Sequence, residues 1–355
     1  MYSRLVCAPP KKLVENGRPV FGTFGGAPER LDIRNVRRPF GVLPMPEFIT
    51  NTRIRSRLSF FFCTDGYIGN IDFLDAKLFG YAELSLWHTA DAKKYAYRCV
   101  SGPKKRLIPH LTAHGLCAAS QHMRHFRVSW NRSRGEAVFT FDVRGDSVRP
   151  SLSGALAADL SAASFCEMSG VYPAPVMRRC RGVYRFTAPV QGHISRTAAV
   201  SREQDTAELD GSMMFLMSRA YCKLRTHTDM VFACGNSGGH SVSFCIVETS
   251  LEAVDPDTYN ENVLFTDGVM TPLPPVRITR PYGVTGKWII QDTESMIDLT
   301  FTPISDNIHR LSIFVLRAVD HLVYGKFEGV LLTAAGERIV LKGFPGMAKK
   351  QNLRL

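Results

Sequence analysis

The feature that most constrains the fold of this chain is an alternation of apolar and polar residues with a period of two. In IDLTFTPI, for example, Ile297, Leu299 and Phe301 alternate with polar residues. Because successive side chains of a strand point to opposite faces, this pattern is typical of β-strands. Stretches of this kind recur in pairs around short polar turns, as in FRVSWNRSRGEAVFTFDV and MVFACGNSGGHSVSFCIV. We therefore predict an all-β, antiparallel fold of sandwich or barrel type.

Glycine-containing turns support the hairpins and exclude some enzyme classes. Asp267-Gly268 and the GNSGG segment at 235–239 each separate two apolar stretches, which favours tight hairpin turns. Neither GNSGG nor GTFGG at 22–26 continues into the Lys-Ser/Thr of a phosphate-binding loop, and no G-x-S-x-G motif of an α/β-hydrolase occurs.

Length and charge suggest two modules. The chain has 355 residues, and its formal net charge of +12 is unevenly distributed. Residues 1–185 contain 28 Lys and Arg against 14 Asp and Glu, whereas residues 186–355 contain 16 against 18. We predict a basic N-terminal β module at 1–185 and a C-terminal β module at 186–355, and we expect an anionic partner for the first. The alternative is that the basic residues are solvated strand faces.

The sequence predicts a cytoplasmic protein with free thiols. Its longest apolar runs, such as LSFFFC, are far shorter than the roughly 20 residues that cross a bilayer, and the N-terminus has no signal-peptide core. The nine cysteines are scattered and include no C-x-x-C pair, so we expect them to be buried thiols.

An arginine stripe is the clearest candidate anion-binding feature. Arg53, Arg55 and Arg57 fall on one face of a predicted strand. Such a row could hold phosphates of a nucleic acid or another anionic adaptor partner, with the phenylalanines at 60–62 as a stacking platform. Three consecutive phenylalanines, however, place at least one ring in the core.

The group richest in metal-ligand residue types is His110, His114, Cys117, His122 and His125. Histidines four apart can share a helix face and a zinc ion, but a glycine interrupts that helix and no carboxylate or paired cysteine completes the set. We expect no metal and no cofactor, with a zinc site as the alternative.

The segment YNENVLFTDGV poses the main question about function. Asn260, Glu261 and Asn262 precede a short apolar strand. They could line a pocket, with Glu261 as an acid, a base or a ligand-orienting group. They could equally be a structural cluster, because Asn and Asp often hydrogen-bond their own turns.

Several short motifs resemble the DUF2804 family, bacterial proteins named for a domain of unknown function. In order, these are LDG, KLRTHTDMVFACG, NENVLFTDG, FTPI and VYGKFEGVLLTAAGERIVLKGFPGMAKK. LVENGRPVFGTFGG and VYRFTAPVQGHI are similar to the family's N-terminal and central segments, so the resemblance spans about residues 5 to 352. It implies an all-β fold like that of lipocalin-like tandem-barrel proteins, which include carotenoid hydratases and binders of hydrophobic ligands.

The resemblance also implies site residues. The positions that match polar motifs of the family are Asp210, Arg225, Glu261, Asn262 and the Asp267-Gly268 turn. We take the first four as candidate ligand-binding residues.

The chain departs from the family pattern at a few positions. Gly211, Thr228 and Met230 stand where the family usually has tryptophans, and Lys349 stands where it tends to have a glutamate. These departures imply a changed ligand cavity and a weaker acid–base role.

Three functions follow as expectations. The first is binding of an apolar or amphipathic small molecule in a cavity within or between two lipocalin-like modules. The second is a hydratase or isomerase acting on such a molecule, which requires Asp210, Glu261 or His227 to converge on one cavity. The third is an anion-binding or nucleic-acid-binding adaptor that uses the basic N-terminal half.

Overall fold

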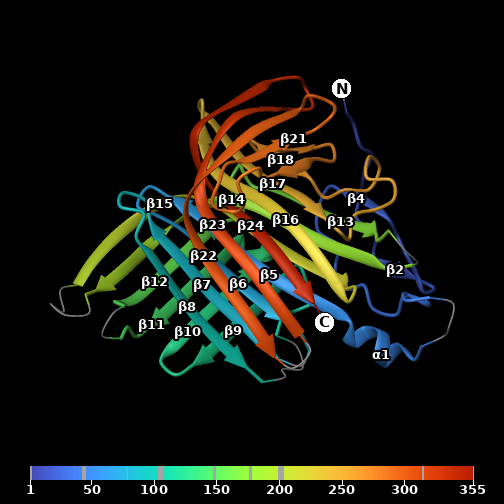
Figure 1. Cartoon of the computed structure of the whole chain (residues 1–355), viewed down its shortest axis with the longest axis horizontal. Coiled ribbons are helices and arrows are strands. Elements are labelled where there is room, and N and C mark those ends of the chain that lie inside the picture. Colours follow the sequence, from blue (N-terminus) through green and yellow to red (C-terminus); the bar gives the residue numbers. More distant parts are fainter. Residues whose placement is uncertain are drawn as a thin grey trace.

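The protein is an antiparallel, almost entirely β-stranded molecule. The computed structural model describes residues 2–41, 45–77, 79–102, 107–146, 149–175, 178–198, 204–313 and 316–354. Two large sheets pack against each other, and the orange and red strands of the second lie across the strands of the first in Figure 1. The predicted fold class, two lipocalin-like β modules in tandem, is confirmed.

The first sheet curves into a nearly closed barrel. Its main strands run in the order β8-β7-β6-β5-β15-β14-β12-β11-β10-β9, while β1, β4 and β13 attach at one side and β1 pairs with β4 in parallel. The two ends of the path meet, because the Val100 backbone N–H donates to Gln121 Oε1 at 2.7 Å and Arg124 Nη1 donates to the Arg98 carbonyl at 3.0 Å. The strands are β1 (Val6–Cys7), β4 (Gly22–Phe24), β5 (Ile54–Thr64), β6 (Tyr67–Asp75), β7 (Gly80–His88), β8 (Lys94–Ser101), β9 (His114–Gln121), β10 (Arg124–Asn131), β11 (Glu136–Val143), β12 (Ser151–Asp159), β13 (Cys166–Pro173), β14 (Cys180–Thr197) and β15 (Gln204–Tyr221).

The second sheet is a half barrel with the order β19-β18-β17-β16-β24-β23-β22-β21-β20. Ile297, Leu299 and Phe301 are buried on one face of β22, as their alternation predicts. Its strands are β16 (Arg225–Ser237), β17 (His240–Thr249), β18 (Val263–Thr266), β19 (Val269–Pro272), β20 (Arg277–Thr279), β21 (Trp288–Gln291), β22 (Ile297–Ile313), β23 (Leu316–Leu332) and β24 (Arg338–Arg354). The remaining elements are a two-stranded ribbon, β2 (Val14–Glu15) and β3 (Arg18–Pro19), the helix α1 (Glu47–Thr52) and the 3-10 turn η1 (Arg132–Arg134).

The predicted hairpins are present. Asp267 and Gly268 both have positive φ values, 50° and 80°, and join β18 to β19, while Gly238 and Gly239 join β16 to β17 in the same way. Asp267 tolerates this conformation because its carboxylate accepts the backbone N–H of Ser241 at 2.8 Å.

Strand β5 is buried on both faces, which explains its unusual phenylalanine run. Leu58, Phe60 and Phe62 point into the first barrel, whereas Phe61 points toward the second sheet and meets Phe232 edge-on at 4.9 Å. The barrel interiors are thus packed with side chains, and a third apolar layer lies between the sheets. The site described below occupies this middle layer.

The sheets change between β15 and β16, at residues 222–224, whereas residue 185 lies inside β14. The division of the chain into folding units at residue 185 stays a prediction. Seven of the nine cysteines are buried, while Cys7 is exposed and Cys166 is half-buried. Within the described residues, no helix has the length and apolar character that a membrane crossing requires.

Candidate ligand-binding site between the two sheets

A cavity of about 140 Å³ lies in the layer between the sheets. Its lining follows the period of two along five strands, because alternate residues of each strand face the partner sheet. These are Arg55, Arg57 and Ser59 on β5, Arg181, Val183 and Arg185 on β14, Leu216, Ser218 and Ala220 on β15, Thr226, Thr228 and Met230 on β16, and Lys349, Gln351 and Leu353 on β24. Leu74, Val247, Leu251 and Glu261 complete most of the wall.

Apolar side chains form one part of the cavity lining and cationic side chains another. The apolar wall includes Leu216, Met230, Leu251 and Leu353, from both sheets. The positive charge comes from the arginine stripe and β14, so two of the arginines predicted to face solvent as an anion-binding surface, Arg55 and Arg57, face the second sheet instead.

Glu261 is the central carboxylate of the cationic wall. It is 5% exposed, and its two oxygens pair with Arg181 Nη2 at 2.9 Å and Arg185 Nη2 at 2.5 Å. Arg185 also donates from Nη1 to the Glu261 carbonyl at 2.5 Å. The carboxylate is therefore fixed by two guanidinium groups from β14 of the first sheet.

The two flanking asparagines have structural roles. Asn262 accepts the Val247 backbone N–H at 2.8 Å and donates to the Pro274 carbonyl at 2.8 Å. Asn260 accepts the backbone N–H of Asn262 at 2.9 Å. These bonds hold the segment before β18 in an irregular path, so that Glu261 reaches across to the first sheet.

A second ion-pair group joins β5, β6 and the second sheet. Asp72 accepts from Lys349 Nζ at 2.5 Å and from Arg57 Nη1 at 3.2 Å, and Arg57 also reaches Asp320 at 3.3 Å. Burial alone would raise the pKa of Asp72, but the charges of Lys349 and Arg57 outweigh it and hold that pKa below its usual value.

Arg55 differs from the other cavity arginines. It is half-buried, its Nη1 donates to the Thr52 carbonyl at 2.7 Å, and its Nε is buried with no hydrogen-bond partner. Burial lowers its pKa. Within the described residues, no carboxylate lies within ion-pair distance of Arg55, although the more distant charge of Asp75 partly offsets the effect of burial on its pKa.

A smaller cavity of about 30 Å³ adjoins the first and shares Arg57, Leu74 and Lys349 with it. Its distinctive residues are Tyr81, Glu83 and His309, and its lining also includes Asp72, Ser85, Asn307 and Asp320.

The polar residues of this smaller cavity are tightly connected. Tyr81 donates to Glu83 at 2.5 Å, and Glu83 also accepts from Arg98 Nε at 2.8 Å and Asn307 Nδ2 at 2.9 Å. The His309 ring stacks on Tyr81 with centroids 4.6 Å apart. Burial lowers the pKa of His309, which keeps its ring neutral at pH 7. These residues are not among those predicted from the sequence. The signal that the sequence offers for them is a pair of polar residues two apart, Tyr81 and Glu83, within an apolar strand.

The residues chosen from the motifs do not all meet. Of Asp210, Glu261 and His227, only Glu261 lines the cavity. Asp210 is exposed on β15, opposite Gln191 of β14. His227 is half-buried and bonds Asn352 at 2.6 Å through Nδ1 and Asp229 at 2.9 Å through Nε2. The convergence that the hydratase or isomerase hypothesis required of these three side chains is absent.

The other motif residues divide between the cavity and its surroundings. Asn262 is buried behind Glu261, while Arg225 is exposed in a neighbouring groove with Arg53. Thr228, Met230 and Lys349, three positions that depart from the expected family pattern, all line the cavity. The differences from that pattern are thus concentrated where a ligand would bind.

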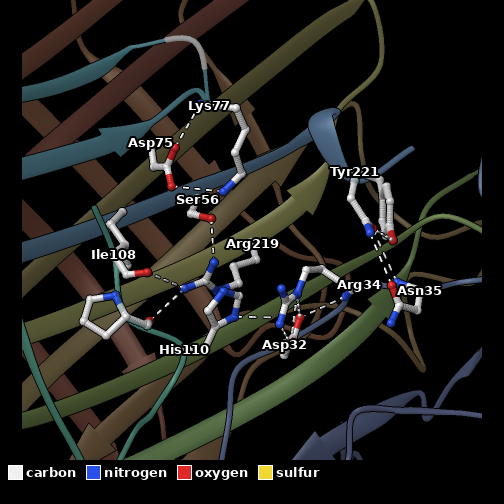
Figure 2. A network of polar contacts seen from close by, with 12 residues as sticks. Asp32, Arg34, Asn35, Ser56, Asp75, Lys77, Ile108, His110, Arg219 and Tyr221 are labelled. Carbon is white, nitrogen blue, oxygen red and sulfur yellow. Dashed lines mark hydrogen bonds and ion pairs between the residues drawn. The ribbon is translucent and has the colours of Figure 1, made fainter. Parts of the chain in front are cut away.

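The histidine-rich segment is dispersed over the barrel. Figure 2 shows His110 beside Asp32, with Nδ1 3.7 Å from a carboxylate oxygen, and near Arg219. Arg219 is 2% exposed and donates to Ser56 and to the carbonyls of Ile108 and Pro109. Burial and the charge of Arg219 lower the pKa of His110 to about 4.

The other members of that segment lie on β9, β10 and the turn between them, where His125 bonds Ser120 at 3.1 Å. Among the described residues, no group of three or more His, Cys, Asp or Glu side chains is arranged to hold a metal ion.

The chain is similar to several solved structures, and its C-terminal part matches one domain model. No curated protein matches the chain. Similar solved structures include a Nitrosomonas europaea protein provisionally named AttH, with 13% identity, a TM-score of 0.47 and coverage of 89% of this chain and 98% of that one. CghA with Sch210972 has 13% identity, a TM-score of 0.49 and 98% coverage of both chains. Kievitone hydratase from Nectria haematococca has 11% identity, a TM-score of 0.41 and coverage of 84% and 88%.

The resemblance inferred from the motifs is confirmed over the C-terminal half of the chain. The sequence model of the domain of unknown function DUF2804 matches residues 187–355, which include β15 and the whole second sheet. This part of the chain is therefore similar to a DUF2804 domain.

Proposed function

We propose that the protein binds an amphipathic anion in the cavity between its two sheets, with the apolar part against the second sheet and the acidic group at Arg55. The observation that carries the proposal is the guanidinium of Arg55, which lines a largely apolar hollow, has no ion-pair partner among the described residues and leaves its buried Nε without a hydrogen bond. Even a half-buried charge without an ion-pair partner is partly desolvated, and a ligand carboxylate, sulfonate or phosphate would offset that cost. Lys349, on β24 of the second sheet, also lines the cavity, but its charge is paired with Asp72.

The size of the cavity limits the enclosed part of the ligand. At about 140 Å³ it compares with the roughly 150 Å³ apolar hollow that holds benzene in an engineered protein. A short aliphatic chain or one aromatic ring fits this volume. Leu216 and Met230 supply facing apolar walls for such a group, so we expect affinity to depend on both the chain and the acidic group.

Displacement of anilinonaphthalene sulfonate, an amphipathic fluorescent anion, tests the proposal. Octanoate, octanol and octylammonium have the same chain and different head groups. We expect octanoate to displace the probe best, and Arg55→Met to weaken octanoate binding by about tenfold, as for loss of a charge-assisted hydrogen bond. Arg55→Lys should retain most of the affinity.

Two outcomes contradict the proposal in different ways. Equal displacement by the three compounds would refute the role of the anionic group and leave an apolar binding site. In the second outcome, none of the three compounds displaces the probe, and native mass spectrometry of the wild-type protein shows no co-purified molecule. That result would refute ligand binding at this cavity.

A second candidate function, proton transfer on the bound molecule, is favoured by the smaller adjoining cavity. His309 is a neutral base stacked on Tyr81, and Arg57 and Lys349 belong to both cavities. For this second function the acidic group of the ligand would lie at Arg57 instead of Arg55, with its neighbouring carbons toward His309.

This second function has its own measurement. A β,γ-unsaturated octenoate incubated with the protein in deuterium oxide should show double-bond migration and deuterium incorporation by NMR, both lost in His309→Gln. Absence of both signals with an octenoate shown to bind would dismiss catalysis and leave the binding function standing.

A further inference from the structure

A shallow groove on the rim of the molecule exposes apolar and basic side chains together. It is formed by the region of the short helix α1, drawn in blue at the edge of the molecule in Figure 1, and by residues 223–225 between β15 and β16. Among the lining residues, Leu224 is 61% exposed and Met45 and Ile49 are also exposed, and Phe48, next to Ile49 on α1, is 72% exposed beside the groove. Exposed apolar side chains gathered in one place usually mark an interaction surface.

Cations surround these apolar side chains. Arg53, Arg179, Lys223 and Arg225 line the groove. The guanidinium groups of Arg53 and Arg179 lie over the ring of Phe40 at 5.2 and 5.7 Å, so the floor of the groove is ordered.

The charge of the groove is mostly unmatched by protein carboxylates. Lys223 donates to the Ser250 carbonyl at 3.0 Å. In the described part of the chain, no carboxylate lies within ion-pair distance of Arg53, Lys223 or Arg225. The acidic residue on α1 is Glu47, which is exposed.

We propose that this groove docks the protein on an anionic lipid bilayer. Protruding apolar side chains surrounded by Lys and Arg fit the boundary between acyl chains and acidic headgroups. There the apolar side chains leave water and the cations are attracted to the headgroups. A nucleic acid would leave Phe48 and Leu224 in water, and a purely acidic protein surface would do the same. Arg53 and Arg179 of the groove belong to the basic N-terminal half, and Lys223 and Arg225 come from the C-terminal half.

The position of the groove connects docking with the cavity. Arg53, directly after α1, lines the groove, and Arg55, two residues later on β5, lines the cavity. Cys222 and Thr226, which line the cavity, flank the groove residues 223–225. A docked molecule would hold its cavity beside the bilayer. Docking goes beyond the proposed ligand binding and does not depend on it.

Co-sedimentation with phosphatidylcholine vesicles, with and without phosphatidylglycerol, tests the docking surface. We expect retention on the anionic vesicles to exceed that on neutral ones by about tenfold or more and to fall with salt. The double variants Phe48→Ser with Leu224→Ser and Lys223→Gln with Arg225→Gln should each reduce it by about tenfold, because they remove the apolar and the electrostatic contribution separately.

A matched control uses the same kinds of substitution elsewhere. Tyr282→Ser with Arg338→Gln changes an exposed aromatic and an exposed cation on other elements and should leave vesicle binding unchanged. All variants should keep the wild-type circular dichroism spectrum and the wild-type displacement of anilinonaphthalene sulfonate by octanoate.

Three results would overturn the inference: equal binding to neutral and anionic vesicles, full binding by either groove variant, or retention on polyglutamate or heparin that survives the loss of Phe48 and Leu224. The last would assign the groove to a soluble polyanion. Because octanoate displacement is measured separately, failure of docking and failure of the cavity function are distinguishable.

Discussion

Arg185 and Glu261 join the two sheets through two hydrogen bonds, one from Nη1 to the Glu261 carbonyl and one from Nη2 to its carboxylate, each 2.5 Å long. Their side chains are 5% and 6% exposed. The contact fixes the irregular segment before β18 against β14 of the first sheet. It therefore determines how the two sheets meet beside the cavity, in addition to neutralising charge.

Glu261→Gln should destabilise the protein strongly. The substitution leaves Arg181 and Arg185 buried beside a neutral amide, and removal of one partner from a buried ion pair costs about 3 kcal/mol or more in the free energy of unfolding. Urea denaturation followed by fluorescence measures this cost. Glu294→Gln, at an exposed carboxylate, is the matched control. A cost below about 1 kcal/mol would show that the attraction between Glu261 and the two arginines does little more than offset the free energy of removing these charges from water.

Local periodicity predicted the strands well and the site only in part. It placed Arg55 and Arg57 on one face of β5, but it carried no information that the second sheet covers that face. Glu261 was recognised because an acidic residue between two asparagines is unusual before an apolar strand. Tyr81 and His309, in contrast, are brought together only by the packing of one sheet on the other, and their surroundings in sequence predict no more than two strands.

Met230→Trp should block the cavity. An indole in place of the thioether fills much of the roughly 140 Å³ volume. We expect octanoate affinity to fall by about tenfold or more, with a stability change of about 1–3 kcal/mol from overpacking. Ile308→Trp, at an exposed position of β22, controls for the added indole. Unchanged displacement of the fluorescent probe by octanoate would place the binding site elsewhere.

His110 should make stability fall as the pH falls from about 6.5 to about 4. Its pKa is about 4 in the folded protein, because of burial and the charge of Arg219, and 6.5 in the unfolded chain. Between these values the unfolded chain binds more protons, so the free energy of unfolding decreases with falling pH, by about 2 kcal/mol for a side chain that keeps some exposure.

The variant His110→Asn isolates this contribution from two others. His309, whose pKa burial also lowers, acts in the same direction, whereas burial raises the pKa of Glu252 to about 7 and makes stability rise as the pH falls. Both remain in the variant. The difference between the unfolding free energies of the two proteins, measured by urea denaturation at a series of pH values, therefore reports His110. A difference that does not vary with pH would contradict the assignment.

Lys349→Met should destabilise the protein in a way that depends on pH. Lys349 is the first of the charges that hold the pKa of Asp72 low, so its removal leaves Asp72 with Arg57 alone and raises that pKa. At neutral pH we expect a loss of about 2–3 kcal/mol for the weakened buried pair. In wild type, the contribution of Asp72 is present above the unfolded value of 3.8 and is lost as the pH falls through the lower folded value. In the variant Asp72 is protonated at a higher pH and no longer carries an unmatched charge. The gap between the unfolding free energies of the two proteins should therefore narrow as acid is added.

Lys342→Met, at an exposed position of β24, should show no such gap. A gap that stays constant down to low pH would mean that Lys349 stabilises the sheets through its aliphatic chain, and that the cationic wall of the cavity does not depend on its pairing with Asp72.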